Sequence, residues 1–228
     1  MDVRGFVRFA AVAAITGNPE FLDELGEALH YETTDSVLNS VMQAHIDEDG
    51  KVFRGGQPHG SLRKADLPAA LTTFLEVHAI PLVQDLTSWC MGQATGNDGM
   101  IWAGVRAVVQ RVHAAASIFG ARDYFAKRML EIIVLVGDGS LSDFRLGAAD
   151  IDMAADLWPL GSGTKDGCRM IFPNATTDDL CRQGLKVLQR ALGGGSREMT
   201  LVRVSAILCF FKRARSGKLP WPAGGATV

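Results

Sequence analysis

The feature that most constrains the fold is a helical repeat of apolar residues within the stretch from residue 97 to residue 138. Apolar side chains recur there in steps of four, three, four and four, at Ile101, Val105, Val108, Val112 and Ala116. This spacing has the period of an α-helix and not the alternation of a half-buried strand. A turn at Phe119-Gly120 and a second apolar run at residues 132–136 complete the pattern, which predicts a hairpin of two long buried helices.

The rest of the chain also favours helices. Caps or prolines that begin helices occur at Asn18-Pro19-Glu20, Leu67-Pro68, Ile80-Pro81 and residues 176–179. Strand-like alternation is almost absent, and residues 46–60 and 161–174 have the glycine content of loops. We therefore predict an all-α, two-lobed protein with an N-terminal helical arm. The predicted parts are the arm (residues 1–45), a lobe with the central hairpin (46–138) and a basic lobe with the tail (139–228).

Charge is distributed unevenly along the chain, although the formal net charge is only −2. Residues 1–50 contain two basic side chains against ten acidic ones, a balance of −8. Residues 181–228 contain nine basic side chains against one acidic one, a balance of +8. The basic C-terminal part is therefore a candidate surface for a polyanion.

No spacing of reactive side chains indicates an enzyme. The five histidines form no H-E-x-x-H, no serine lies in G-x-S-x-G, and the glycine-rich stretch at Gly161–Lys165 lacks the order of a phosphate-binding loop. The four cysteines lack the spacing of zinc ligands, and Cys90 and Cys209 lie in apolar runs that predict buried thiols in a reducing compartment. We expect no catalytic residue, metal or cofactor, although an active site assembled from distant residues stays open.

One predicted helix carries a row of cations. Arg182, Lys186 and Arg190 recur every four residues, and no acid lies four residues from Lys186 or Arg190 to pair with it. A groove of such residues binds a sugar–phosphate backbone without reading its sequence, and nearby aromatic rings stack on bases. The aromatic candidates are Tyr31, Phe53 and Tyr124. A solvated helix face is the alternative interpretation.

The N-terminal part resembles a known family. Residues 6–10 (FVRFA), followed by Glu20, Leu25, Glu27, Tyr31 and Asp35, are similar to the helical arm that opens the nucleocapsid proteins of phleboviruses and their relatives. Residues 54–58 (RGGQP) resemble a second segment of that family, whereas residues 200–205 (TLVRVS) resemble a third but lie nearer the C-terminus than in the family. The resemblance implies an all-α protein with a basic cleft for single-stranded RNA and an arm that docks on a neighbouring subunit. It also implies that Tyr31 stacks on a base and that Arg54 contacts a phosphate.

Together these features predict a self-assembling viral nucleocapsid protein that encapsidates single-stranded RNA without sequence specificity, in the virion and the host cytoplasm. A helical matrix or scaffold protein without nucleic acid and a small helical ligand-binding protein are the alternatives. The expected partners are single-stranded RNA and other copies of the chain, with no membrane insertion. The predicted RNA-binding residues are Tyr31, Arg54, Arg63, Lys64, Arg106, Arg111, Arg122, Lys127, Arg182, Lys186, Arg190 and Arg203. The predicted oligomerisation residues are Phe6, Phe9, Phe21, Leu22 and Leu25.

Overall fold

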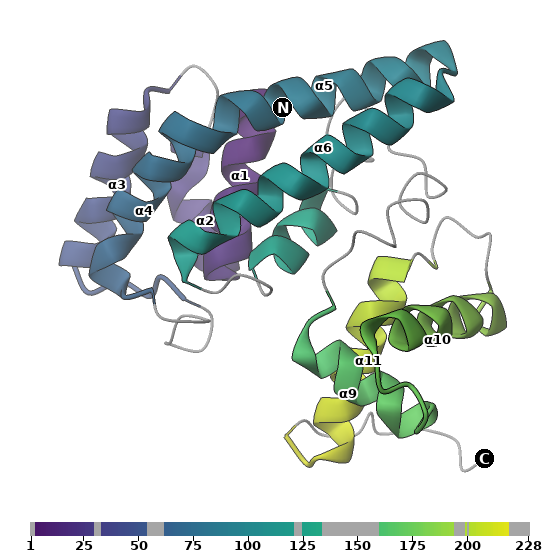
Figure 1. Cartoon of the computed structure of the whole chain (residues 1–228). Helices are drawn as coiled ribbons and strands as arrows, with labels where there is room; N and C mark the ends of the chain where they lie inside the picture. Colours follow the sequence, from purple (N-terminus) through teal and green to yellow (C-terminus); the bar gives the residue numbers. More distant parts are fainter. Residues whose placement is uncertain are drawn as a thin grey trace. The chain divides into compact units, whose positions relative to one another are not determined.

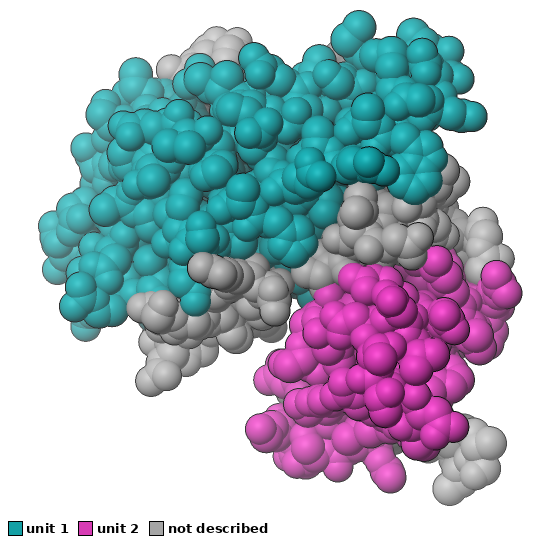
Figure 2. Space-filling model, in the orientation of Figure 1, with its two compact units in different colours: residues 1–146 teal, residues 147–228 magenta. Residues whose placement is uncertain are grey.

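The structure is a computed structural model, and it describes residues 3–29, 33–53, 62–120, 125–133, 160–193, 199 and 201–218. All regular structure in these ranges is helical, which confirms the predicted all-α class (Figure 1). The chain divides into two compact units, unit 1 (Met1–Leu146) and unit 2 (Gly147–Val228), which Figure 2 shows in separate colours. The predicted three-part division stays a prediction. None of the described helices is long and apolar enough to cross a membrane.

Unit 1 contains six labelled α-helices and several short helical turns among its described residues. The α-helices are α1 (Val3–Thr16), α2 (Pro19–Leu25), α3 (Asp35–Asp47), α4 (Leu67–Phe74), α5 (Ile80–Thr95) and α6 (Asp98–Ala116). The short turns are η1 (Gly26–Leu29), η2 (Lys64–Asp66), the π-helical turn η3 (Leu75–Ala79) and η4 (Ser117–Phe119). Residues 125–133 are also helical.

Helix α1 lies in the core of unit 1. Eleven of its residues are buried, and Phe6 and Val7 have no exposed surface, because the helix is rich in small and apolar residues on every side. Of the predicted oligomerisation residues, Phe6, Phe21 and Leu25 are buried and Phe9 and Leu22 are half-buried. Docking of this segment on a neighbouring subunit stays a prediction, and it would require α1 and α2 to leave this core.

The predicted break at Ile80-Pro81 is wrong, because α4, η3 and α5 form one continuous helical segment. Pro81 has no N–H to donate to the preceding turn and its ring crowds that turn. The π-helical turn at Leu75–Ala79 ends two residues before Pro81. This turn widens the backbone where an α-helix would clash with the proline ring. Backbone angles at Leu75 and Ile80 stay in the right-handed helical region, so the helix continues through the proline.

Helix α6 confirms the predicted repeat of apolar residues. All five apolar residues of that row are buried, and Gly120 adopts a left-handed conformation at the predicted turn. Before the helix, Gly96 is also left-handed and Asn97 is the N-cap. The helix packs mainly along α5, and the two run side by side in Figure 1. Gly104 permits this contact, because a Cβ atom there would lie 2.6 Å from the Cα of Trp89.

Removal of the Asn97 cap is expected to destabilise unit 1 modestly. The Asn97 Oδ1 accepts a hydrogen bond from the Met100 N–H at 3.1 Å, which satisfies one of the unpaired donors in the first turn of α6. Asn97→Ala should lower the free energy of unfolding by about 1 kcal/mol, and Asn97→Asp should largely preserve it. Urea denaturation followed by circular dichroism measures both changes, and equal losses in the two variants would contradict a capping role.

Unit 2 contains α9 (Ser162–Ile171), α10 (Asp178–Ala191) and α11 (Leu201–Arg215) among its described residues. The prediction of a loop at residues 161–174 is wrong, because α9 occupies most of it. Gly163 and Gly167 face α11, where a Cβ at Gly167 would lie 2.2 Å from the Leu208 carbonyl oxygen. Thr164 is buried between these glycines, and its hydroxyl lies 2.9 Å from that of Ser205. The glycines therefore allow two helices to pack closely and do not form a phosphate-binding loop.

The buried thiols are not the two that the sequence predicts. Cys168 and Cys181 are completely buried between the helices of unit 2, whereas Cys90 and Cys209 are half-buried. All four cysteines are free. Burial raises the pKa of the Cys168 thiol to about 11 and that of Cys90 to about 12, so both remain protonated at neutral pH.

Candidate nucleic-acid interface

The two units differ in the sign of their charge. Within the described residues, unit 2 has ten basic side chains against three acidic ones, a formal charge of +7. Unit 1 has nine basic side chains against thirteen acidic ones over its described residues, a formal charge of −4. The basic character that the sequence showed near the C-terminus therefore belongs to one folded unit, and unit 2 is the candidate site for a polyanion.

The three acids among the described residues of unit 2 are all engaged by cations. The ion pairs join Lys212 and Arg169 to Asp166 at 2.6 and 3.6 Å, Lys165 to Asp178 at 2.8 Å and Arg182 to Asp179 at 3.5 Å. Arg190, Arg213, Arg215 and Lys218 are exposed and lie outside these pairs. These four cations are thus presented to solvent.

The cation row on α10 is only partly exposed. Leu185 and Cys181 face the core, so the row begins at the edge of the buried face and turns outward by about 40° with every step of four residues. Arg182 and Lys186 are accordingly half-buried, and Arg190 at the end of the row is exposed. Arg190 is therefore the member of this row best placed to contact a phosphate.

An exposed aromatic residue, which the sequence interpretation missed, lies on α11. Phe210 is 61% exposed, the largest exposed fraction among the large apolar side chains of the described residues. Buried Val204 and Leu208 define the opposite face of the helix. Arg203, seven residues before Phe210, shares its side of α11, and Arg213 follows one turn later, so a ring is flanked by two exposed cations. The inward row at residues 201, 204, 205 and 208 was the signal that could have identified Phe210 as exposed.

Two of the exposed cations, Arg213 and Arg215, also have a structural role at the C-terminal end of α11. Gly217 adopts a left-handed conformation, and the N–H groups of Gly217 and Lys218 bond to the carbonyls of Ala214 and Arg213 at 3.1 and 2.9 Å. Cations in the last turn of a helix are favoured by its dipole, so Arg213 and Arg215 stabilise α11 whether or not they bind a ligand.

The cations predicted as RNA contacts in unit 1 are mostly paired with acids. The ion pairs join Arg63 to Asp66 at 2.7 Å, Lys64 to Asp49 at 2.9 Å, Arg111 to Asp85 at 3.1 Å and Lys127 to Glu131 at 3.8 Å. Hydrogen bonds from Lys64 and Arg63 lower the pKa of the Asp49 and Asp66 carboxyls, so both acids stay ionised. Arg106 is exposed, and Tyr31, Arg54 and Arg122 lie outside the described residues.

Of the aromatic residues predicted to stack on bases, Phe53 is the one that the structure describes. Phe53 is 5% exposed, so its proposed role in stacking on a base is wrong. Tyr124, like Tyr31, lies outside the described residues. Among the residues that the structure describes, exposed rings near exposed cations occur on α11 of unit 2 and on α6 of unit 1, where Trp102 is 38% exposed and Arg106 follows one turn later. The greater exposure of Phe210 and the positive charge of unit 2 favour α11.

Comparisons with known proteins found no match, so the functional interpretation depends on the structure and the sequence. The chain matches no family model, no curated protein and no solved structure. Within the described ranges, no group of three or more histidine, cysteine or acidic side chains could hold a metal ion.

Proposed function

We propose that this protein binds single-stranded RNA through unit 2 without reading its sequence, as a self-assembling nucleocapsid protein would. The observation that carries the proposal is Phe210, an exposed ring flanked on α11 by Arg203 and Arg213 in a unit with a formal charge of +7. Cations of this kind gain affinity by releasing the counterions of the phosphate backbone. A ring among them stacks on any unpaired base, because every base has a π-face.

The assembly part of the proposal is supported by charge and by resemblance. Unit 1 and unit 2 have opposite formal charges over their described residues, and opposite charges favour association between different copies of the chain. The resemblance of residues 6–10 and 54–58 to phlebovirus-like nucleocapsid proteins supports the same function. Large particles with excess absorbance at 260 nm that dissociate in salt are expected in size-exclusion chromatography with light scattering. A monomer without nucleic acid would contradict the assembly.

Charge reversal on unit 2 is expected to weaken RNA binding and to reduce its dependence on salt. The triple variant Arg190→Glu, Arg213→Glu and Arg215→Glu removes about three phosphate contacts, which should flatten the slope of log K against log[salt] by about 2. Affinity should fall by more than about tenfold near 0.1 M salt. Fluorescence anisotropy with a labelled oligouridylate of about 12 nucleotides, over about 50 to 200 mM salt, measures both quantities.

A matched control separates the site from the total charge. Arg63→Glu, Lys64→Glu and Arg106→Glu impose the same change in net charge on unit 1, at three exposed or half-exposed positions. Because the proposal assigns these three residues no phosphate contact, the affinity should stay within about threefold of the wild type. Phe210→Ala should weaken binding by about 5- to 100-fold, the range for loss of one stacked base. Equal losses in the two triple variants, or unchanged binding by Phe210→Ala, would remove α11 from the interface.

A further inference from the structure

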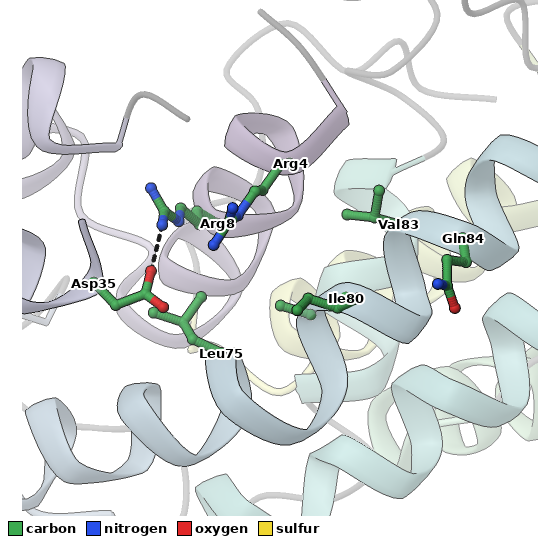
Figure 3. A pocket seen from close by; sticks show the side chains of 8 residues that line it. Arg4, Arg8, Asp35, Leu75, Ile80, Val83 and Gln84 are labelled. Carbon is green, nitrogen blue, oxygen red and sulfur yellow. Dashed lines mark hydrogen bonds and ion pairs between the residues drawn. The ribbon is translucent and has the colours of Figure 1, made fainter. Parts of the chain in front are cut away.

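Unit 1 contains a pocket that the RNA proposal does not use. It has a volume of about 270 Å³ and lies between α1, the first residue of α3 and the segment from η3 into α5 (Figure 3). Arg4 and Arg8 extend from successive turns of α1 on one side, and Leu75 and Ile80 lie opposite them. The pocket is slightly smaller than the roughly 300–1,000 Å³ of sites for drug-sized molecules, so its size suits a smaller ligand.

The charged residues of the pocket favour an anion with a single charge. Among the described lining residues the ionisable ones are Arg4, Arg8 and Asp35, whose formal charges sum to +1. Arg8 is held in place, because it is 1% exposed and its guanidinium donates hydrogen bonds to the Thr33 carbonyl at 2.6 Å and to the Asp35 carboxylate. Because Asp35 offsets the charge of Arg8, the net positive charge of the described lining corresponds to Arg4, and the fixed Arg8 guanidinium loses little entropy on binding.

The remaining walls favour an aliphatic body on that anion. Leu75, Ala79, Ile80 and Val83 line the pocket, and none of its described lining residues is aromatic. Ile80 is 55% exposed although it lies at the pocket, so a ligand there would remove apolar surface from water. The π-helical turn places Leu75 and Ile80 at this wall, and such turns occur frequently at functional sites. The described part of the lining offers a nucleotide no ring on which to stack, and a polar sugar does not match an aliphatic wall.

We propose that this pocket binds a small aliphatic carboxylate, with the carboxylate at Arg4 and Arg8 and the hydrocarbon chain against Leu75, Ile80 and Val83. Arg4 is exposed and approaches the ligand directly, and its planar fork matches the two oxygens of a carboxylate. Arg8 contributes its charge while it remains bonded to Asp35. The site is distinct from the basic surface of unit 2, so either proposal can fail without the other.

Isothermal titration of the full chain with sodium octanoate tests the proposal. A Kd on the order of 10⁻⁵–10⁻⁴ M is expected, which corresponds to an intermediate ligand efficiency over about ten non-hydrogen atoms. Arg4→Gln should raise the Kd at least about tenfold through loss of a charge-assisted hydrogen bond. Ile80→Gln should also weaken binding, and both residues are exposed, so neither variant removes core packing. Arg106→Gln, at an exposed arginine of unit 1 outside the pocket, is the matched control and should bind as the wild type does.

Two ligand controls define the chemistry. Octan-1-ol, which lacks the charge, and acetate, which lacks the hydrocarbon chain, should each bind at least about tenfold more weakly than octanoate. Absence of octanoate binding, equal binding of octan-1-ol, or equal weakening by Arg106→Gln would overturn the proposal. Displacement of octanoate by oligouridylate would overturn it as well, because the pocket would then belong to an RNA site.

Discussion

Replacement of Gly167 by alanine is expected to destabilise unit 2 by about 3 kcal/mol, in the upper part of the range for overpacked cores. A Cβ atom at this position of α9 would lie 2.2 Å from the carbonyl oxygen of Leu208 and 2.8 Å from its carbonyl carbon. Both atoms belong to the backbone of α11, so a side-chain rotation cannot relieve the clash. The two helices would have to separate, which would loosen the core cluster that contains Leu208 and Val204.

Hydrogen exchange of the full chain measures this effect unit by unit. Amides of α9 and α11 should exchange about 100-fold faster in Gly167→Ala, whereas those of α5 and α6 in unit 1 serve as the internal reference. Gly163→Ala is the matched control, because its Cβ would meet the side-chain sulfur of the half-buried Cys209 at 2.6 Å, and a thiol can rotate away. It should change stability by about 1 kcal/mol or less. Equal losses at the two glycines would contradict a special role for the backbone contact between Gly167 and Leu208.

These glycines also show where prediction from the sequence failed. A glycine-rich stretch with a lysine is typical of a loop, and the sequence alone does not reveal that Gly163, Gly167 and Gly184 face other helices. Helix α6 was predictable because its signals are local: the apolar repeat, the Asn97 cap and the left-handed Gly96 all lie within one short stretch. Close packing against a distant helix leaves no comparable local pattern.

In the candidate RNA site, too, local sequence patterns were informative and contacts between distant residues were not predictable. The sequence identified Arg190 by its spacing, and the inward row of α11 could have identified Phe210. It could not identify Asp85 as the partner of Arg111, 26 residues away, because such a pair forms only when α5 packs along α6. A count of cations in the sequence therefore overestimates the charge that unit 1 can offer to RNA.

The pocket of unit 1 depends on similar long-range contacts. Arg8 lies within a run of apolar residues, and the interpretation of the sequence included it only through the resemblance of residues 6–10. Its guanidinium meets Thr33 and Asp35, 25 and 27 residues away, where the chain enters α3. An arginine in an otherwise apolar helix is thus a signal worth following, because burying its charge requires partners elsewhere in the fold.

Replacement of Arg8 by methionine is the second large effect that we expect. Methionine retains most of the buried stem, so the change removes chiefly the guanidinium, which is 1% exposed and bonded to Thr33 and Asp35. Breaking a buried ion pair costs about 3–5 kcal/mol, but the Asp35 side chain is 35% exposed and water can solvate it in part. We therefore expect a loss of about 2–3 kcal/mol from the free energy of unfolding of unit 1.

A double-mutant cycle distinguishes the ion pair from packing. Asp35→Asn alone should also destabilise unit 1, because it leaves the buried guanidinium of Arg8 without its anion. If the pair is responsible, the double variant Arg8→Met and Asp35→Asn should be more stable than the sum of the two single losses predicts, by about 1 kcal/mol or more. Hydrogen exchange in α1 and α3, with α10 as the reference, measures all three variants. Strict additivity would show that Arg8 stabilises α1 through its stem alone, and its charge would then be available chiefly for a ligand in the pocket.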